Sequence, residues 1–342
     1  MTRNPNQYLV NFFALILAAA LSVAVGSVVI PPGTLARILL ARLPGALIQP
    51  DWPETFSVIV FQVRVPHTAL ILLAGAALGS SGAAYQGLFR NPLADPYLIG
   101  VASGAGLGAV LAMSWQWQIS VLGLYAVPAA AFIGALLTVT LVYFLARVGG
   151  AAPTANLILA GVAGSAFMNA LTSFLMLGSN QEIRRALNWL LGGGSMSGWQ
   201  PVLAMLPYLI PGATVLMASG HALNVLQFGD EQAQQMGLPV ERSKVVIIAA
   251  ASLTAASAVA FAGIIGFIGL IVPHVIRMVW GPDYRQIIPL SFLGGGVSLL
   301  LADFLARTVL APQVLPVGIV TALAGAPFFL WVLRRAKSGN IG

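Results

Sequence analysis

The sequence predicts an all-α, polytopic membrane protein with about ten transmembrane helices. Three observations lead to this prediction. The 342 residues are 58% hydrophobic and only 7% charged, whereas about a quarter of the residues in an average soluble domain are charged. Apolar runs of roughly 20 residues, the length that crosses a bilayer, recur along the whole chain. Glycine is abundant, with 37 residues, and small residues allow membrane helices to pack closely.

The apolar runs define ten expected spans. Their bounds are 9–30, 66–86, 97–113, 119–145, 155–178, 201–219, 244–262, 263–280, 287–306 and 314–333. The first run is longer than the apolar part of a secretory signal and has no cleavage site after it, so we expect it to be retained. A polar, proline-rich segment at 31–63 follows it, and residues 181–191 predict a short extra helix. The chain 1–342 is then one transmembrane domain.

The basic residues favour cytoplasmic termini, because Lys and Arg concentrate in cytoplasmic loops. With ten spans, both termini lie on one side. That side holds ten basic residues, which are Arg3, Arg90, Arg147, Arg242, Lys244, Arg277, Arg285, Arg334, Arg335 and Lys337. The other side holds six, which are Arg37, Arg42, Arg64, Arg184, Arg185 and Arg307. The net charge of +7 therefore reports orientation, and we expect no nucleic-acid partner because no basic cluster is present.

The longest polar interruption in the second half of the chain is Gln227–Pro239. Asp230 can cap a short helix there, and Gly237 suits the left-handed position at its end. Ala233 and Met236 are three residues apart and share a helix face, so the helix is expected to lie against another surface. An ordinary solvated loop between two spans is the alternative.

Several kinds of catalytic site are absent from the sequence. Lys244 and Lys337 are the only lysines, and neither belongs to a phosphate-binding G-x-x-x-x-G-K-[ST] motif, so we expect no ATP hydrolysis by this chain. There is no H-E-x-x-H or G-x-S-x-G motif and no cysteine, and we expect no metal site. Gly100, Gly104 and Gly108 resemble part of a dinucleotide fingerprint, but their place inside an apolar span favours close helix packing.

Asp303 is the only acidic residue well inside an expected span. Ion-coupled carriers usually place acidic residues within the bilayer. Arg307 follows four residues later, so a local ion pair on one helix face is the alternative interpretation. A pathway with almost no fixed charge suits a bulky solute that is moved by opening and closing, with energy supplied by another protein.

The chain resembles a known family, the permease subunits of importers for iron–siderophores, haem and cobalamin (the FecCD-type ABC permeases). The resemblance extends from about Arg64 to Arg334. It rests on separated sequence blocks, which are Arg64-Val-Pro-His-Thr68, Asn91-Pro-Leu-Ala-Asp-Pro96, Leu98-Ile-Gly100, Leu159-Ala-Gly161, Trp189-Leu-Leu-Gly-Gly193, Gln235-Met-Gly-Leu-Pro239, Gly263-Ile-Ile-Gly-Phe-Ile-Gly-Leu-Ile-Val-Pro-His274, Leu301-Ala-Asp303, Leu315-Pro-Val-Gly318 and Gly325-Ala-Pro327.

The resemblance implies a type II ABC importer permease in the bacterial inner membrane. Two permease subunits, most simply identical, surround a central pathway through the lipid bilayer. Two cytoplasmic ATPases carry ATP and Mg²⁺, so this chain itself binds no cofactor, and a periplasmic binding protein delivers the cargo. The implied cargo is an iron chelate, either haem or a ferric siderophore. A cobalamin importer permease and an ion-coupled secondary carrier are the alternatives, and an intramembrane enzyme has almost no support from the residues.

The resemblance also implies roles for individual residues. The coupling loop at about 224–242 docks into the ATPase, and the residues that we expect in this contact are Asp230, Glu231, Gln234, Gln235 and Gly237. The residues expected to dock the binding protein are Arg64, Arg307 and His67. The family often has a second arginine at the position of His67, and a histidine there weakens the contact or makes it pH-dependent. For Arg64, anchoring the end of a span is the alternative.

Two further groups of residues are implied in the pathway. Asn91, Leu93 and Thr154 match loops that narrow it toward the cytoplasm, although Asn91-Pro92 also suits a plain turn. Arg184 and Arg185 match a basic position near the outer vestibule, where they would meet carboxylates of the cargo; the alternative is that they cap or solvate the short helix. His274 is expected to be a packed structural histidine.

Overall fold

The computed structural model describes residues 6–26, 28–42, 49, 51–117, 126–149, 151–177, 183–194 and 198–337. Some parts of the sequence predictions lie outside these residues. They are Arg3, residue 27 of the first span, residues 43–48 and 50 of the proline-rich segment, residues 119–125 of the fourth span, residue 178 of the fifth, and residues 181–182 of the short helix. The described chain is helical, and its one β-type feature is an isolated bridge between Val148 and Ala151.

The ten predicted spans are each matched by a helix in the described chain. Seven segments are long and apolar enough to cross a membrane: α1 (Asn6–Ala24), Glu54–Phe89, α6 (Ala126–Ala146), α7 (Thr154–Leu177), α9 (Trp199–Ala218), α12 (Val240–Ala262) and α14 (Tyr284–Thr308). Glu54–Phe89 combines α3 (Glu54–Val58), the π-helical η1 (Ile59–Arg64) and α4 (Val65–Phe89). Three shorter apolar helices are α5 (Val101–Ser114), α13 (Ile268–Trp280) and α15 (Val317–Lys337). The prediction of a polytopic all-α membrane fold is therefore confirmed.

Five short elements connect or flank these spans. They are α2 (Pro32–Leu40), the 3₁₀ helix η2 (Pro96–Ile99), α8 (Ile183–Leu190), α10 (Gly220–Leu226) and α11 (Asp230–Gln235). The short helix expected at 181–191 is α8. The prediction that residues 31–63 form only a polar connection is wrong in part, because α2, α3 and η1 form within this segment. Proline is tolerated at the start of a helix, and Pro31, Pro32 and Pro53 all lie at such starts.

The expected bounds of the first and eighth spans are also wrong. The first helix ends at Ala24 rather than residue 30. The eighth begins at Ile268 rather than residue 263, because residues 263–267 interrupt the helix. Gly263 has φ +82° and Phe267 has φ +70°, values that end an α-helix and are readily adopted by glycine. A β-carbon at Gly263 would lie 2.5 Å from the carbonyl oxygen of Trp189, so this turn requires glycine.

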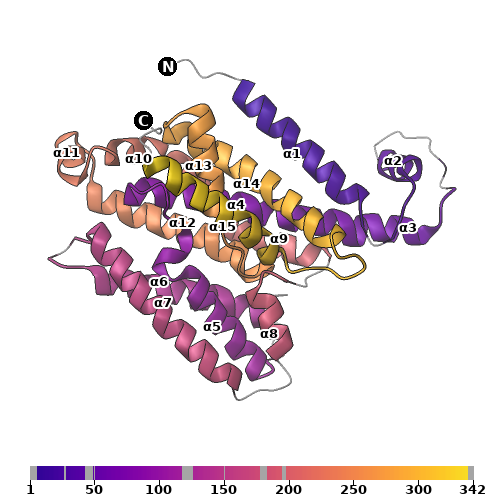
Figure 1. The fold of residues 1–342 in the computed structure, drawn as a ribbon, viewed down its shortest axis with the longest axis horizontal. Helices are drawn as coiled ribbons and strands as arrows, with labels where there is room; N and C mark the ends of the chain where they lie inside the picture. The colour runs from indigo at the N-terminus through magenta and orange to yellow at the C-terminus, as the bar shows by residue number, and fades with distance from the viewer. Residues whose placement is uncertain are drawn as a thin grey trace.

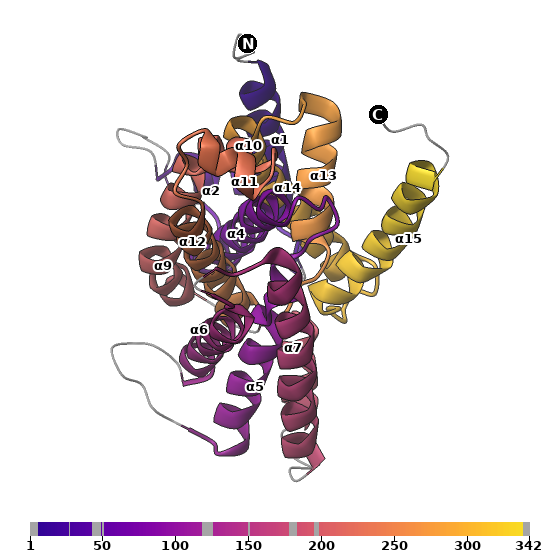
Figure 2. The ribbon, with the colours of Figure 1, turned by 90° about the vertical axis from the view of Figure 1, so that its left-hand side faces the viewer.

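Helix α4 is the centre of the molecule (Figure 1). All of its residues from Ala74 to Phe89 are buried, and it packs against α12, α13 and α14. Helix α1 lies along α14, and α9 lies against α12. Helices α5, α6 and α7 form a second group, which α12 joins to α4. Figure 2 shows α15 at the outside, where it contacts α13 and α14.

Glycines allow α4 and α14 to pack with their backbones in contact. A β-carbon added at Gly75 would lie 2.3 Å from the carbonyl oxygen of Gly295, and one at Gly79 would lie 2.2 Å from that of Ser291. The same packing joins α5 to α6, where a β-carbon at Gly104 would lie 2.4 Å from a carbonyl oxygen of α6. The prediction that the glycines of α5 serve helix packing is confirmed.

Replacing Gly79 with alanine is expected to lower the free energy of unfolding by about 1–3 kcal/mol, the usual cost of overpacking a close-packed interior. The new methyl group would force α4 and α14 apart. Thermal unfolding of the purified protein in detergent measures this loss. Gly33→Ala on α2 is the control, because no atom lies within 4 Å of its new methyl group. An equal loss of stability in both variants would contradict the packing account.

Candidate functional site

Helices α10 and α11 form a bent polar element, here called the α10–α11 segment (residues 220–239). Gly229, with φ +101°, separates the two helices, and Gly237, with φ +86°, follows the second. Ala233 is fully buried, whereas the exposed face consists of Glu231, Gln232, Gln234, Gln235 and Met236. The predicted short helix is confirmed. It therefore presents a row of uncharged amides and one acid at the surface.

Two details of that prediction are wrong. Met236 is 60% exposed and does not share the buried position of Ala233, because α11 ends at Gln235 and the chain turns away at Gly237. Asp230 is the first helical residue rather than the cap. Its carboxylate instead accepts a hydrogen bond from Lys244 Nζ at 2.5 Å. The sequence-based assignment of Asp230 to helix capping missed this partner on α12.

Side-chain hydrogen bonds tie the α10–α11 segment to three long helices. Lys244, on α12, is only 3% exposed, so the lysine end of its ion pair with Asp230 is buried. Gln227 donates from Nε2 to the carbonyl oxygen of Gly87 on α4 at 2.9 Å. Asn224 donates to Asp283, the residue that caps α14, at 2.7 Å. The segment is therefore fixed to α4, α12 and α14 by side-chain hydrogen bonds.

The cap of α14 keeps its charge over the physiological pH range. Hydrogen bonds from the side chain of Arg285, together with that from Asn224, lower the pKa of Asp283 to about 2. The Tyr284 backbone N–H donates in turn to Asn224 Oδ1 at 2.8 Å. Because Asp283 stays ionised, the connection between α10 and α14 does not depend on pH near neutrality.

A fourth connection leads from α12 to α7. Glu241 Oε1 lies 3.5 Å from Lys244 Nζ, and its Oε2 accepts a hydrogen bond from the backbone N–H of Ala152 at 3.2 Å. Ala152 is two residues before Thr154, the first residue of α7. The predictions missed Lys244 and Glu241. The signal that could have found them is a lone lysine at the start of an apolar span with acidic residues upstream.

The predicted gate residue Asn91 lies beside the α10–α11 segment. Asn91, Gln227, Arg277 and Tyr284 line a cavity of about 190 Å³. Asn91 Oδ1 accepts a hydrogen bond from the Leu93 N–H at 2.9 Å, so the plain turn is present. Thr154 does not line this cavity. The structure therefore brings Asn91 and the segment together, and the gating role of Asn91, Leu93 and Thr154 stays a prediction.

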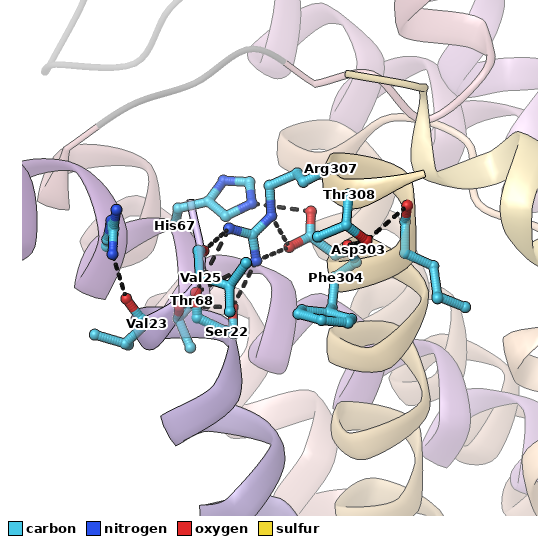
Figure 3. A network of polar contacts seen from close by, with 11 residues as sticks. Ser22, Val23, Val25, His67, Thr68, Asp303, Phe304, Arg307 and Thr308 are labelled. Carbon is cyan, nitrogen blue, oxygen red and sulfur yellow. Dashed lines mark hydrogen bonds and ion pairs between the residues drawn. The ribbon is translucent and has the colours of Figure 1, made fainter. Parts of the chain in front are cut away.

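At the far ends of α4 and α14, a buried charge cluster joins these two helices to α1 (Figure 3). We call its five residues, Ser22, His67, Thr68, Asp303 and Arg307, the Asp303 cluster. Asp303 is paired with His67 Nε2 at 3.0 Å and with Arg307 at 2.8 Å. Arg307 also donates to the hydroxyl of Ser22 at 3.0 Å and to the carbonyl oxygen of Val25 at 3.0 Å. The expected ion pair on one helix face is confirmed, and it extends to three helices.

Arg64 is turned into the protein beside this cluster. It is only 6% exposed and donates hydrogen bonds to the carbonyl oxygens of Val23 at 2.9 Å and Ala24 at 3.0 Å, with Val28 as a third acceptor. The carbonyls of Val23 and Ala24 belong to the end of α1, where a helix leaves its last carbonyls without intrahelical partners. Arg64 thus caps α1, which supports the alternative of an anchor. Docking by Arg64 stays a prediction.

The other predicted site residues lie apart from both groups. Arg184 and Arg185 are exposed on α8, and their vestibule role stays a prediction. His274 is 8% exposed and stacks edge-on against Phe328 of α15, with ring centroids 6.2 Å apart. The expected packed histidine is therefore confirmed. In the part of the chain that the structure describes, no group of three or more histidine and acidic side chains is placed to hold a metal ion.

Known proteins of one family match this chain over nearly its whole length. The model of the FecCD transport family matches residues 14–335. The cobalamin import system permease BtuC of Halobacterium salinarum is 48% identical over 282 residues, which are 82% of this chain and 75% of that protein. The uncharacterized ABC transporter permease YvrB of Bacillus subtilis is 39% identical over 334 residues, 97% of this chain and 94% of that protein. The hemin transport system permease HmuU of Yersinia pestis is 39% identical over 287 residues, 83% and 85% of the two chains.

A solved structure shows the same architecture. It is described as an inward-facing conformation of a metal-chelate type ABC transporter. The TM-score is 0.80 with 29% sequence identity, and the match covers 97% of this chain and 99% of that chain. The arrangement of helices and the family blocks of the sequence therefore lead to the same group of proteins.

Replacing Asp303 with asparagine is expected to lower the free energy of unfolding by about 3 kcal/mol, because it leaves a buried guanidinium without its partner. The side chains of Asp303 and Arg307 are 7% and 16% exposed. Asp51→Asn is the matched control. The Asp51–Arg37 pair is 59% and 47% exposed, and such pairs contribute less than about 1 kcal/mol. Thermal unfolding in detergent compares the two, and a smaller loss for Asp303→Asn than for Asp51→Asn would contradict this account.

Proposed function

Because this chain belongs to the FecCD transport family and is an ABC importer permease, we propose that it carries an iron chelate, haem or a ferric siderophore, across the bacterial inner membrane. The cargo arrives on a periplasmic binding protein, and a separate ATPase supplies the energy. The observation that carries this proposal is the α10–α11 segment, whose outer face is exposed while its inner face is hydrogen-bonded to α4, α12 and α14.

The α10–α11 segment is the proposed contact with the ATPase, on the cytoplasmic side together with both termini. Glu231, Gln234, Gln235 and Gly237 are exposed there. Asp230 points back to Lys244, so its contribution is to position the helix. A short helix fixed to three spans moves them as a rigid body when the surface beneath it shifts. Two ATPases would bind two copies of this chain, with ATP and Mg²⁺ held by the ATPases and no cofactor held by this chain.

The Asp303 cluster is the proposed contact with the binding protein. Arg307 and His67 are 16% and 31% exposed, which leaves part of each side chain accessible at this end. Charged contacts of this kind set the register of docking more than they raise affinity. Arg64 stabilises this surface indirectly, because its hydrogen bonds fix the end of α1 against η1 and α4.

The Asp303 cluster also weighs against an ion-coupled carrier. A carboxylate that couples transport to an ion gradient must be free to bind and release that ion. Asp303 is instead paired with Arg307 on its own helix and with His67 on α4. Energy from a separate ATPase is therefore the better supported alternative.

The cargo is the least constrained part of the proposal. The relatives named above are a cobalamin permease and a hemin permease, and the solved structure is described as a metal-chelate transporter. Exposed Arg184 and Arg185 on α8 favour an anionic cargo in the outer vestibule. Cobalamin is the alternative cargo, and the binding protein is expected to set most of the selectivity.

The proposal is tested by ATP hydrolysis in a reconstituted complex of this chain with an ATPase and a binding protein from the same organism. Binding protein loaded with haem, a ferric siderophore or cobalamin is compared. We expect one loaded form to stimulate hydrolysis. Stimulation by none of the three, or no complex with the ATPase, would contradict the proposal.

In the same assay, Glu231→Lys is expected to lower the stimulated rate by about tenfold or more, because a reversed charge in an interface costs several kcal/mol. Glu54→Lys is the matched control, since Glu54 is an exposed acid on α3, at the opposite end of the molecule (Figure 1). Equal effects of the two substitutions would remove the α10–α11 segment from the proposed contact.

Lys244→Met is expected to separate ATPase binding from stimulation. The exposed face of α11 is unchanged in this variant, so the ATPase still binds, but the buried hydrogen bond from α12 to Asp230 is lost. We expect the stimulated rate to fall about tenfold, close to the effect of losing a buried charged contact. Arg242→Met, at an exposed position on the same turn, is the control and should retain stimulation. Normal stimulation in Lys244→Met would show that the hydrogen bond between Lys244 and Asp230 is not needed for coupling to the ATPase.

A further inference from the structure

A second cavity, of about 560 Å³, lies where η2, α7 and the turn before α13 meet. Its lining is mostly apolar and includes Phe267, the residue with φ +70°. Among the residues that the structure describes, Asp95 contributes the only carboxylate of the lining, and Ser165 and Asn169 of α7 contribute neutral polar groups. A carboxylate in so apolar a lining is unusual, because removing a charge from water is costly.

Asp95 is held in this position by the local backbone. It precedes η2, and its Oδ1 accepts a hydrogen bond from the Tyr97 N–H at 2.8 Å. Within the part of the chain that the structure describes, no basic side chain forms an ion pair with it. The Tyr97 hydroxyl donates to the carbonyl oxygen of Ile265 at 2.8 Å, so this phenol is turned toward the 263–267 turn. Of the lining residues that the structure describes, Asp95 is thus the one that can carry charge near neutral pH.

The helices around the cavity do not cancel this charge. Helices α5 and α7, which both pack against η2, have no acidic, basic or histidine residue over Val101–Ser114 and Thr154–Leu177. A charge in a partly desolvated lining acts over a longer distance than one at an open surface, because water screens it less. The cavity therefore has a negative electrostatic potential that originates at Asp95.

We propose that Asp95 makes this cavity a section of the cargo pathway that favours cationic and hydrogen-bond-donating groups of the cargo and disfavours carboxylates. This proposal rests on the proposed function, since it assigns the cavity to the pathway of a transporter. The proposal gives the pathway two regions of opposite electrostatic potential. Cargo carboxylates meet the exposed arginines of α8, and donor groups of the cargo meet Asp95.

The preference depends on pH in a defined direction. Burial raises the pKa of Asp95 to about 6, so the carboxylate is ionised at pH 7.5 and largely protonated at pH 5. Other ionisable side chains on the elements packed around η2 lie outside the cavity lining; they are His67 and Tyr85 on α4, Tyr143 on α6, Glu241, Arg242 and Lys244 on α12, and His274 and Arg277 on α13. The negative potential is therefore lost as the pH falls through about 6.

The absence of cysteine from the 342-residue sequence permits a direct test on the purified chain. Ser165→Cys places a single thiol in the lining. Its rates of reaction with a trimethylammonium and a sulfonate methanethiosulfonate are each divided by the rate with free mercaptoethanol. We expect the cationic reagent to be favoured about tenfold at pH 7.5, the size that a nearby unit charge produces. The preference should fall toward one at pH 5.

Variants of Asp95 identify the source of the preference. In the Ser165→Cys background, Asp95→Asn should abolish it and Asp95→Glu should retain it. Asn169→Cys offers a second thiol in the same lining. Ser173→Cys, about two helical turns further along α7, is the control and should not respond to Asp95→Asn. A preference that survives Asp95→Asn, or thiols at both 165 and 169 that react with neither reagent, would overturn the proposal. No ATPase or binding protein is needed, so this outcome is independent of the test of the importer complex.

Discussion

The close packing of α4 against α14 is the constraint on which the rest of the structure depends. Glycines at the crossing bring the two backbones into contact, and the same helices carry both candidate sites. At one end, Asp283, which caps α14, accepts a hydrogen bond from Asn224 of α10, and Gly87 near the end of α4 accepts one from Gln227. At the other end lie Asp303 and Arg307 of α14 and His67 of α4. Two packed helices with no flexible layer between them connect the surfaces proposed to bind the ATPase and the binding protein.

Charge is confined to positions where a partner or a cavity accommodates it. Buried Lys244 is paired with Asp230, and buried Asp303 with Arg307 and His67. Asp95, in contrast, borders a cavity without a basic partner among the described residues, which is why it becomes a candidate for contact with cargo. Large apolar side chains on α1, α7 and α15 are exposed in the single chain. A lipid bilayer accommodates such apolar faces.

Sequence reasoning predicted the features that depend on local pattern. Apolar runs of bilayer length give the ten spans, and the four-residue spacing of Asp303 and Arg307 gives their pair. It missed features that depend on contacts between distant segments. Arg64 is buried because the end of α1, about 40 residues earlier, meets its guanidinium, and Lys244 is buried because α11 folds back on α12. The junction between the seventh and eighth spans was predicted at 262–263, but the non-helical residues 263–267 were missed because they are as apolar as a helix interior. The roles predicted for the gate residues and for the vestibule arginines depend on cargo and on partner proteins, which the structure of the single chain does not contain.

Cargo uptake into proteoliposomes tests the central claim, that this chain transports with energy from a separate ATPase. Vesicles containing this chain and its ATPase, with ATP inside and loaded binding protein outside, are compared with vesicles containing this chain alone under an ion gradient. The account predicts uptake in the first case and none in the second. Uptake by this chain alone, driven by the gradient, would contradict it.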